Sequence, residues 1–305
     1  MNVKSLFSLL VAAFLGAATF FTGANARAAE SQKLRIIVFG AHPDDAQYKA
    51  GGTAAKWAKL GHKVKLVSVT NGDIGHWQTA GGPLAQRRLA EVKKADALIG
   101  AATEVYDIHD GELMPTLENR LKVIRSIREW EADIVISHRP WDYHPDHRYV
   151  GILVQDAAFM VTVPFICPDV PPLKKNPVFL YSSDGFKKPV PFQADIVVSV
   201  DDVMAQKVTA IHEMPSQAYE GGAGGSAESQ SSKPPASDEA GRKAWLRQHW
   251  ERRQGGEANR FRADLVQWYG PEKGAQVKFA EAFEICEYGR KPTPAEIKVL
   301  FPFFP

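Results

Sequence analysis

LRIIVFGAHPDD, residues 34–45, is the stretch that decides the fold of this chain. Its centre, residues 36–39, is β-branched or aromatic throughout, which is the pattern of a strand buried on both faces of a parallel sheet. The run leads directly into His42 and the adjacent pair Asp44 and Asp45. Because open α/β sheets bind their ligands at the carboxyl ends of such strands, we expect the chemistry of this protein where the run ends.

Strand-like and helix-like segments alternate after this stretch. Apolar residues at helical spacing predict helices over residues 49–60, 83–100 and 117–130, and a further helix that opens in residues 141–147 and runs to about residue 160. Continuous apolar runs predict further strands over residues 64–69, 105–108, 133–136, 178–181 and 196–200. The alternation predicts an α/β fold, a Rossmann-like, doubly wound and mostly parallel sheet with helices on both faces and the site at the carboxyl ends of the strands.

The last third of the chain has a different character. Asp201 or Asp202 is placed to cap a helix that reaches His212. Residues 220–241 are rich in Gly, Ser, Pro and Ala without apolar periodicity, which predicts a mobile loop. A basic helix around residues 245–253 and a helical tail through residues 279–283 are expected to follow. The predicted organisation is a leader over 1–28, a domain core over 29–219, the loop over 220–241 and a helical extension of the same domain over 242–305.

The amino terminus reads as a secretory signal peptide. Lys4 precedes an apolar run from Leu6 to Phe21, and small residues that include Ala24-Asn25-Ala26 and Ala26-Arg27-Ala28 come after it. The alternative is a transmembrane anchor, but the run of roughly 15 residues is short for a span of about 20. We therefore expect cleavage near Ala28 and a secreted or periplasmic protein with no transmembrane span in its mature form.

Composition narrows the classes of function. The chain has 305 residues and a formal net charge of +2, which gives no reason to expect nucleic acid or an anionic membrane as its main partner. Its two cysteines, Cys167 and Cys286, are too few for a disulfide framework or a cysteine zinc site, and the sequence leaves open whether they pair. It also leaves the oligomeric state open.

A second chemical cluster, WDYHPDH over residues 141–147, follows the strand predicted over 133–136. Taken together, His42, Asp45 and His147 are two imidazoles and a carboxylate, and catalytic zinc sites typically have three protein ligands and one open position. Asp44, next to a ligand, can face a metal-bound water without coordinating the metal, as a general base must. For either cluster alone the alternative is a set of polar loop residues with Asp45 as a helix cap. Two clusters after separate buried strands favour a site.

The two clusters resemble a known family. His42-Pro43-Asp44-Asp45 and His144-Pro145-Asp146-His147 are similar to the paired motifs of the PIG-L/LmbE-like zinc-dependent N-deacetylases, which include N-acetylglucosaminyl-phosphatidylinositol deacetylase. Further segments follow in the family's order: Gly51-Gly52-Thr53, Thr70-Asn71-Gly72-Asp73, Arg88 with Glu91, Asp110-Gly111-Glu112-Leu113 and Ser216-Gln217. The resemblance extends over about residues 34–217.

Carried over to this chain, the resemblance implies roles for single residues. His42, Asp45 and His147 would hold Zn²⁺, and Asp44 would be the general base. His144 would stabilise the oxyanion or protonate the departing amine, a role that suits an imidazole titrating near neutrality. Asp146 would orient one of the histidines.

The resemblance also points to substrate-binding residues. Arg88 and Asp110 match positions associated with recognition of sugar hydroxyls, although an exposed helix charge and a turn residue are the alternatives. His76 and Trp77, beyond the second strand, and Tyr143, beside the second motif, are expected in the pocket wall. Two departures, Ala46 where the family usually has Glu and Met214 where it often has His, bear on substrate and rate more than on metal binding.

The sequence therefore predicts a secreted or periplasmic zinc-dependent hydrolase. It would remove an acetyl group from the nitrogen of an amino sugar such as N-acetylglucosamine, or of a glycoconjugate, by metal-activated water. One alternative is a non-haem iron enzyme, because two histidines and a carboxylate also hold Fe(II). The other is an inactive, carbohydrate-binding member of the fold.

Overall fold

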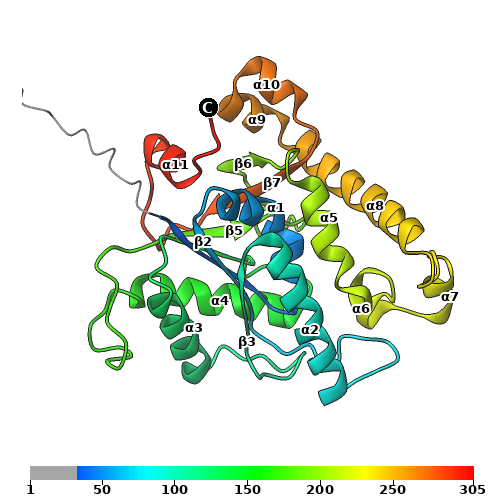
Figure 1. Ribbon diagram of the computed structural model, residues 1–305. Helices are drawn as coiled ribbons and strands as arrows, with labels where there is room; N and C mark the ends of the chain where they lie inside the picture. The colour runs from blue at the N-terminus through cyan, green and yellow to red at the C-terminus, as the bar shows by residue number, and fades with distance from the viewer. Residues whose placement is uncertain (1–32) are drawn as a thin grey trace, which may run out of the picture. The chain divides into compact units, whose positions relative to one another are not determined.

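The structure is a computed structural model that describes residues 33–305. Its centre is a seven-stranded sheet in the order β3-β2-β1-β4-β5-β7-β6 (Figure 1). Strands β1 to β5 pair in parallel, and β7 runs antiparallel to both of its neighbours. The strands are β1 Arg35–Gly40, β2 Lys63–Ser68, β3 Ala102–Val105, β4 Ile134–Ser137, β5 Val178–Ser182, β6 Ile196–Ser199 and β7 Ala280–Ile285. The leader expected over residues 1–28 lies outside the described residues.

Helices cover both faces of the sheet (Figure 1). One core contains α1 (Asp45–Lys59), α2 (Gly82–Ile99), α5 (Met204–His212) and α8 (Glu239–Arg260), and the other contains α3 (Leu117–Glu129) and α4 (Pro145–Met160). Strand β1 shows why its sequence is continuously apolar, since Ile36 and Val38 pack into the first core whereas Ile37 and Phe39 pack into the second. The doubly wound, mostly parallel α/β fold is therefore confirmed.

Some elements begin elsewhere than predicted. Helix α1 begins at Asp45 rather than at residue 49, because its polar first turn is buried without showing apolar periodicity. Strand β3 ends at Val105, where the expected strand began, because its partner β2 stops at the facing Ser68. Neither Asp201 nor Asp202 caps α5, whose N-cap is Val203. Asp201 accepts hydrogen bonds from the backbone of residues 278–279, and Asp202 pairs with Lys56.

The carboxyl-terminal third corrects two expectations. Residues 280–285 are not a helical tail but strand β7, which inserts between β5 and β6. Residues 220–241, expected to be a loop, contain η1 (Gly222–Gly224), α7 (Ala227–Ser231) and the start of α8. The remaining helices are α6 Pro215–Ala218, α9 Arg262–Tyr269, α10 Pro271–Gln276 and α11 Pro294–Leu300. The last segment is therefore part of the sheet that positions the site, rather than an appendage.

A buried ion pair joins β7 to the two helices beside it. Glu281 and Lys207 are fully buried and lie 2.7 Å apart (Oε1 to Nζ). Glu281 also accepts hydrogen bonds from the backbone N–H groups of Gly52 and Thr53 in α1, at 2.9 and 2.8 Å. A Cβ on Gly52 would lie 2.9 Å from the Glu281 carboxylate and 2.8 Å from Val200, so glycine permits this close approach.

Replacing Glu281 by alanine is expected to destabilise the fold strongly. Removing one partner of a buried pair leaves the other charge uncompensated, which typically costs about 3–5 kcal/mol of unfolding free energy. Chemical denaturation followed by circular dichroism measures it. Glu287→Ala is the matched control, because that side chain is 79% exposed and should change nothing measurable. Equal unfolding midpoints for the two variants would show that the pair does not stabilise the fold.

Two further observations bear on the sequence analysis. Within residues 33–305, none of the helices combines the length and the apolar character that crossing a bilayer requires. Cys167 and Cys286 are both buried and both free, so the question of their pairing is answered for this structure.

Candidate functional site

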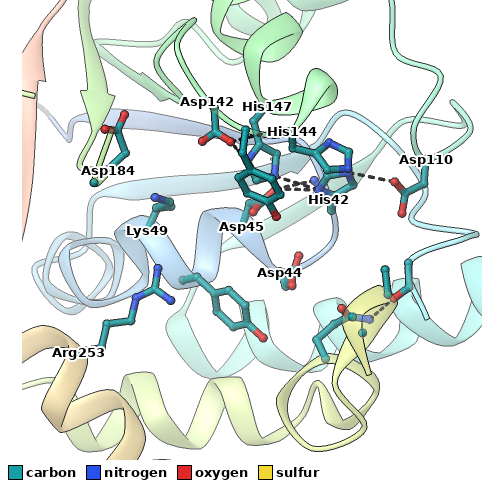
Figure 2. Close-up of a pocket in the computed structure, with 18 of the residues that line it drawn as sticks. His42, Asp44, Asp45, Lys49, Asp110, Asp142, His144, His147, Asp184 and Arg253 are labelled. Atoms are coloured by element: carbon teal, nitrogen blue, oxygen red, sulfur yellow. Dashed lines mark hydrogen bonds and ion pairs between the residues drawn. The ribbon is translucent and has the colours of Figure 1, made fainter. Parts of the chain in front are cut away.

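A cavity of about 680 Å³ opens at the carboxyl end of the sheet, next to β1 and β4 (Figure 2). His42 lies two residues beyond β1, and Asp45 is the first residue of α1. His147 lies in the first turn of α4. The two HPD motifs, about a hundred residues apart in the sequence, therefore meet because their strands β1 and β4 are neighbours in the sheet.

Three of the donor atoms at this end of the cavity form a nearly equilateral triangle. Nδ1 of His42 lies 3.3 Å from Oδ2 of Asp45 and 3.2 Å from Nε2 of His147. The last two atoms are 3.3 Å apart. A tetrahedral ion with bonds of roughly 2.0–2.2 Å needs ligand atoms about 3.3–3.6 Å apart. The donor set thus fits a single metal ion.

Carboxylates face the other nitrogen of each histidine. Nε2 of His42 lies 3.1 Å from Asp110 and 3.2 Å from Asp146, and Nδ1 of His147 lies 3.1 Å from Asp142. A ring that donates its outer N–H to a carboxylate turns the lone pair of its other nitrogen inward, as metal ligation requires. Asp146 is fully buried and also accepts the N–H of Gly111, which fixes it in place.

The charges around the triangle favour a cation. Burial alone lowers the pKa of His147, but Asp45 and Asp142 outweigh it and raise that pKa to about 9. Burial likewise opposes protonation of His42, yet its hydrogen bonds to Asp110 and Asp146 hold its pKa well above the usual value. The same carboxylates would stabilise a dication between the two rings.

His138 lies close to the triangle but is not a suitable ligand. Its Nε2 accepts the backbone N–H of Ala41 at 3.2 Å, so that lone pair is already used. Burial, together with the charge of His147, lowers the pKa of His138 to about 4, and its ring stacks on His147 at 4.3 Å. His138 therefore supports the position of His147 as a neutral neighbour.

Asp44 stands outside the triangle. Its Oδ1 lies 3.3 Å from Nη2 of Arg88, and it lines the cavity. Burial raises the pKa of Asp44 to about 6, although Arg88 acts in the opposite direction. Arg88 is only 2% exposed and also donates to the carbonyl of Gly72, so it is not an exposed helix charge.

His144 is the N-cap of α4. Its Nδ1 accepts the backbone N–H of Asp146 at 3.2 Å, which leaves Nε2 as the donor of the neutral ring. The ring lies 4.6 Å from that of His42 and lines the cavity. Burial and the neighbouring His42 lower the pKa of His144, which keeps the ring neutral at ordinary pH.

Only some of the residues expected in the pocket wall line the cavity. Arg88, Asp110 and Tyr143 line the cavity. His76 and Trp77 do not, because Nε2 of His76 pairs with the Glu220 carboxylate at 3.0 Å and Nε1 of Trp77 donates to the Glu220 carbonyl. The structure therefore places both residues outside the lining of this cavity. They instead hold the start of residues 220–241, whose glycines 221, 222 and 224 line the cavity.

The two departures from the family pattern are apolar residues in the core. Ala46 is 2% exposed and Met214 is fully buried, both in the core beside α1. His212 does not replace the missing histidine, since its Nδ1 lies 2.7 Å from the hydroxyl of Tyr219, and it does not line the cavity.

Comparison with known proteins finds a family model and relatives that are similar to part of this chain. Residues 37–158 match the PIG-L family model, described as GlcNAc-PI de-N-acetylase. Diacetylchitobiose deacetylase of Thermococcus kodakarensis is 32% identical over 136 residues, which is 43% of this chain and 51% of that enzyme. The chain thus spans about half the length of this relative.

Two further relatives extend over more of the chain. The 4-oxalmesaconate hydratase of Pseudomonas putida is 23% identical over 198 residues, 62% of this chain and 75% of that protein. The solved structure of N,N'-diacetylchitobiose deacetylase from Pyrococcus horikoshii superposes with a TM-score of 0.58 and 21% identity, and covers 86% of this chain and 88% of that one. At that identity the superposition supports the fold.

Proposed function

We propose that this chain, whose residues 37–158 match the PIG-L family model, is a zinc-dependent hydrolase that removes an N-acetyl group from an amino sugar or glycoconjugate. The observation that carries the proposal is the triangle of donor atoms from His42, Asp45 and His147. The Asp44 carboxylate lies next to this triangle and is not one of its corners. A metal site with a free carboxylate alongside suits hydrolysis by activated water.

Zinc is the metal that the donor set favours. Two imidazoles and one carboxylate are typical protein ligands of catalytic zinc, which keeps a further position open. The same set holds Fe(II) in oxygenases. Asp44 and His144 support zinc, because water attack on an amide needs a base and an electrophile, whereas oxygen activation needs neither.

The residues around the triangle have separate roles in amide hydrolysis. Zinc, when bound, supplies a Lewis acid that polarises the carbonyl and makes water acidic. Asp44 accepts the proton of the attacking water, and Arg88 holds its carboxylate in place. His144 donates a hydrogen bond from Nε2 to the oxygen on which negative charge develops, and Asp44 passes the proton it took from the water to the departing amine.

Other carboxylates hold the ligand side chains in place, and the cavity leaves room for a substrate. Asp142 and Asp146 fix the two ligand rings, so that their lone pairs do not turn away. The cavity volume of about 680 Å³ is in the range of small-molecule sites and exceeds what an acetamido group fills. Tyr143, 73% exposed at the cavity, offers an aromatic face to a sugar ring.

A second candidate is hydration of an unsaturated acid, favoured by the longer match to the 4-oxalmesaconate hydratase. Both reactions use activated water, but only deacetylation releases acetate. The deciding experiment is a screen of N-acetylated amino sugars and glycans, together with 4-oxalmesaconate, on the zinc-loaded protein. Acetate release supports the proposal, and hydration without acetate release overturns it. Binding of glycans without either reaction would identify an inactive, carbohydrate-binding protein.

We also propose that the protein is exported, on the basis of Lys4, the run from Leu6 to Phe21 and the small residues after it. Protein recovered from the envelope or medium is expected to begin between Arg27 and Glu30 on amino-terminal sequencing. Leu10→Arg, which breaks the apolar run, should leave the leader attached. Recovery of the native chain from the cytosol with Met1 intact contradicts the proposal.

A further inference from the structure

The wall of the cavity away from the metal ligands carries positive charge. Lys49 of α1 and both Arg253 and Arg260 of α8 line it. Figure 2 shows Lys49 and Arg253 next to each other, on the side of the cavity opposite Asp110. Asp44, Asp110 and Asp142 lie around the triangle, whereas Asp184 and Glu257 line the cavity on the side of Lys49. Among the described residues, this wall thus carries three cations and two carboxylates.

Lys49 and Arg253 lack the carboxylate partners that Arg88, another cation of the cavity, has. Across residues 33–305, neither has a carboxylate within 4 Å. Lys49 donates only to the carbonyl of Ser183, at 2.8 Å, and the Arg253 guanidinium lies over the ring of Trp250 at 5.1 Å. Arg88, in contrast, is paired with the Asp44 carboxylate.

The acidic groups near these two cations contact other residues, although Oε2 of Glu257 has no hydrogen-bond partner. Asp184 accepts from Nε of Arg139 at 3.1 Å, and Oε1 of Glu257 accepts the hydroxyl of Ser183. Arg260 donates to the carbonyl of Asp184 and packs over Phe192. Lys49 and Arg253 lie next to each other, so a single ligand between them would contact both (Figure 2).

Two neighbouring positive charges without a counter-ion are unfavourable. Burial and the charge of Arg253 both lower the pKa of the Lys49 amine, which reflects this cost. A guanidinium offers a planar fork to two oxygens, and an ammonium adds a compact charge with rotatable donors. An anion with at least two oxygens would satisfy both groups.

We propose that Lys49 and Arg253 form a subsite for an anionic substituent, a carboxylate or a phosphate, on the N-acylated amino sugar. The inference rests on the proposed function and narrows its substrate class to acidic amino sugars. The acyl group would lie at the triangle and the anion at the far wall. Arg253 lies outside the residues that match the family model, so helix α8 supplies this specificity.

The test compares sugars that differ in charge. Acetate release by the zinc-loaded protein is measured as kcat/KM for neutral N-acetylglucosamine, for N-acetylmuramic acid and for N-acetylglucosamine 6-phosphate. The wild type should prefer one of the two anionic sugars, and Arg253→Gln or Lys49→Gln should reduce that preference by about 10–100-fold, the value of a lost charge-assisted hydrogen bond. The anionic sugar whose kcat/KM falls more in these variants identifies the group as carboxylate or phosphate.

Arg252→Gln is the matched control, because Arg252 is exposed on the same helix and does not line the cavity. Equal turnover of neutral and anionic sugars by the wild type overturns the inference, and so does an equal loss in Arg252→Gln and Arg253→Gln. If no sugar releases acetate, the proposed function fails, and calorimetry decides the subsite separately. The anionic sugars are titrated into Asp44→Asn and into the double variant Asp44→Asn/Arg253→Gln. Weaker binding to the double variant supports the subsite. Equal affinity for both proteins, or no binding to either, overturns it.

Discussion

His42→Ala, Asp45→Ala and His147→Ala are each expected to lose the bound metal and with it all measurable turnover. Their three donor atoms lie 3.2–3.3 Å from one another, so each supplies one corner of the proposed coordination shell. Removing one corner leaves two protein ligands, whereas catalytic zinc sites typically have three. Elemental analysis after gel filtration measures occupancy, and circular dichroism verifies the fold.

Neighbouring residues give graded controls for that experiment. Asp142→Asn, which weakens the support of His147 at 3.1 Å, should reduce metal affinity by about 10–100-fold rather than abolish it. His138→Gln should keep the metal, because the Nε2 of His138 accepts from Ala41 and is not a ligand. Full occupancy in all three ligand variants would show that the proposed ligand set is wrong.

The part of the fold that the sequence predicted is the part that local pattern determines. Residues 36–39 are apolar on both sides because each side faces a different helical layer, and that pattern is visible without any partner. Strand β7 was not predicted, because its place between β5 and β6 depends on pairing with residues about a hundred positions earlier. Its short apolar run has no feature that separates a strand from a helix.

In the candidate site, too, the sequence predicted the residues that belong to local motifs and not those that depend on packing. The two HPD motifs carry the proposed ligands, and their neighbouring strands explain why they meet. Asp142 was missed as a support for His147, since a carboxylate five residues before a ligand has no distinctive spacing. The approach of Arg253 to Lys49 also could not be read from sequence, because it depends on how α8 packs against the cavity. His76 and Trp77 lie outside the cavity lining, since position after a strand does not fix which way a side chain turns.

Asp44→Asn and His144→Ala are expected to keep the metal and lose catalysis. Neither side chain belongs to the triangle: Asp44 pairs with Arg88, and His144 accepts the N–H of Asp146 through Nδ1. Loss of a general base or of a donor to the developing oxyanion typically reduces kcat by about 10²–10⁴-fold. Both groups act as the tetrahedral species forms, so substrate affinity should change little.

The combination of full occupancy with low kcat distinguishes the mechanisms. A ligand variant loses metal and turnover together, and an iron oxygenase or a binding protein has no reason to depend on Asp44 as a base. Metal content, acetate release and KM are measured on the same preparations of both variants, with whichever N-acetylated sugar the wild type accepts. Glu112→Gln serves as a control, because this exposed residue near Asp110 does not line the cavity. Near-wild-type kcat in Asp44→Asn would end the proposed mechanism, since no other cavity-lining carboxylate of residues 33–305 stands beside the triangle without facing one of its histidines.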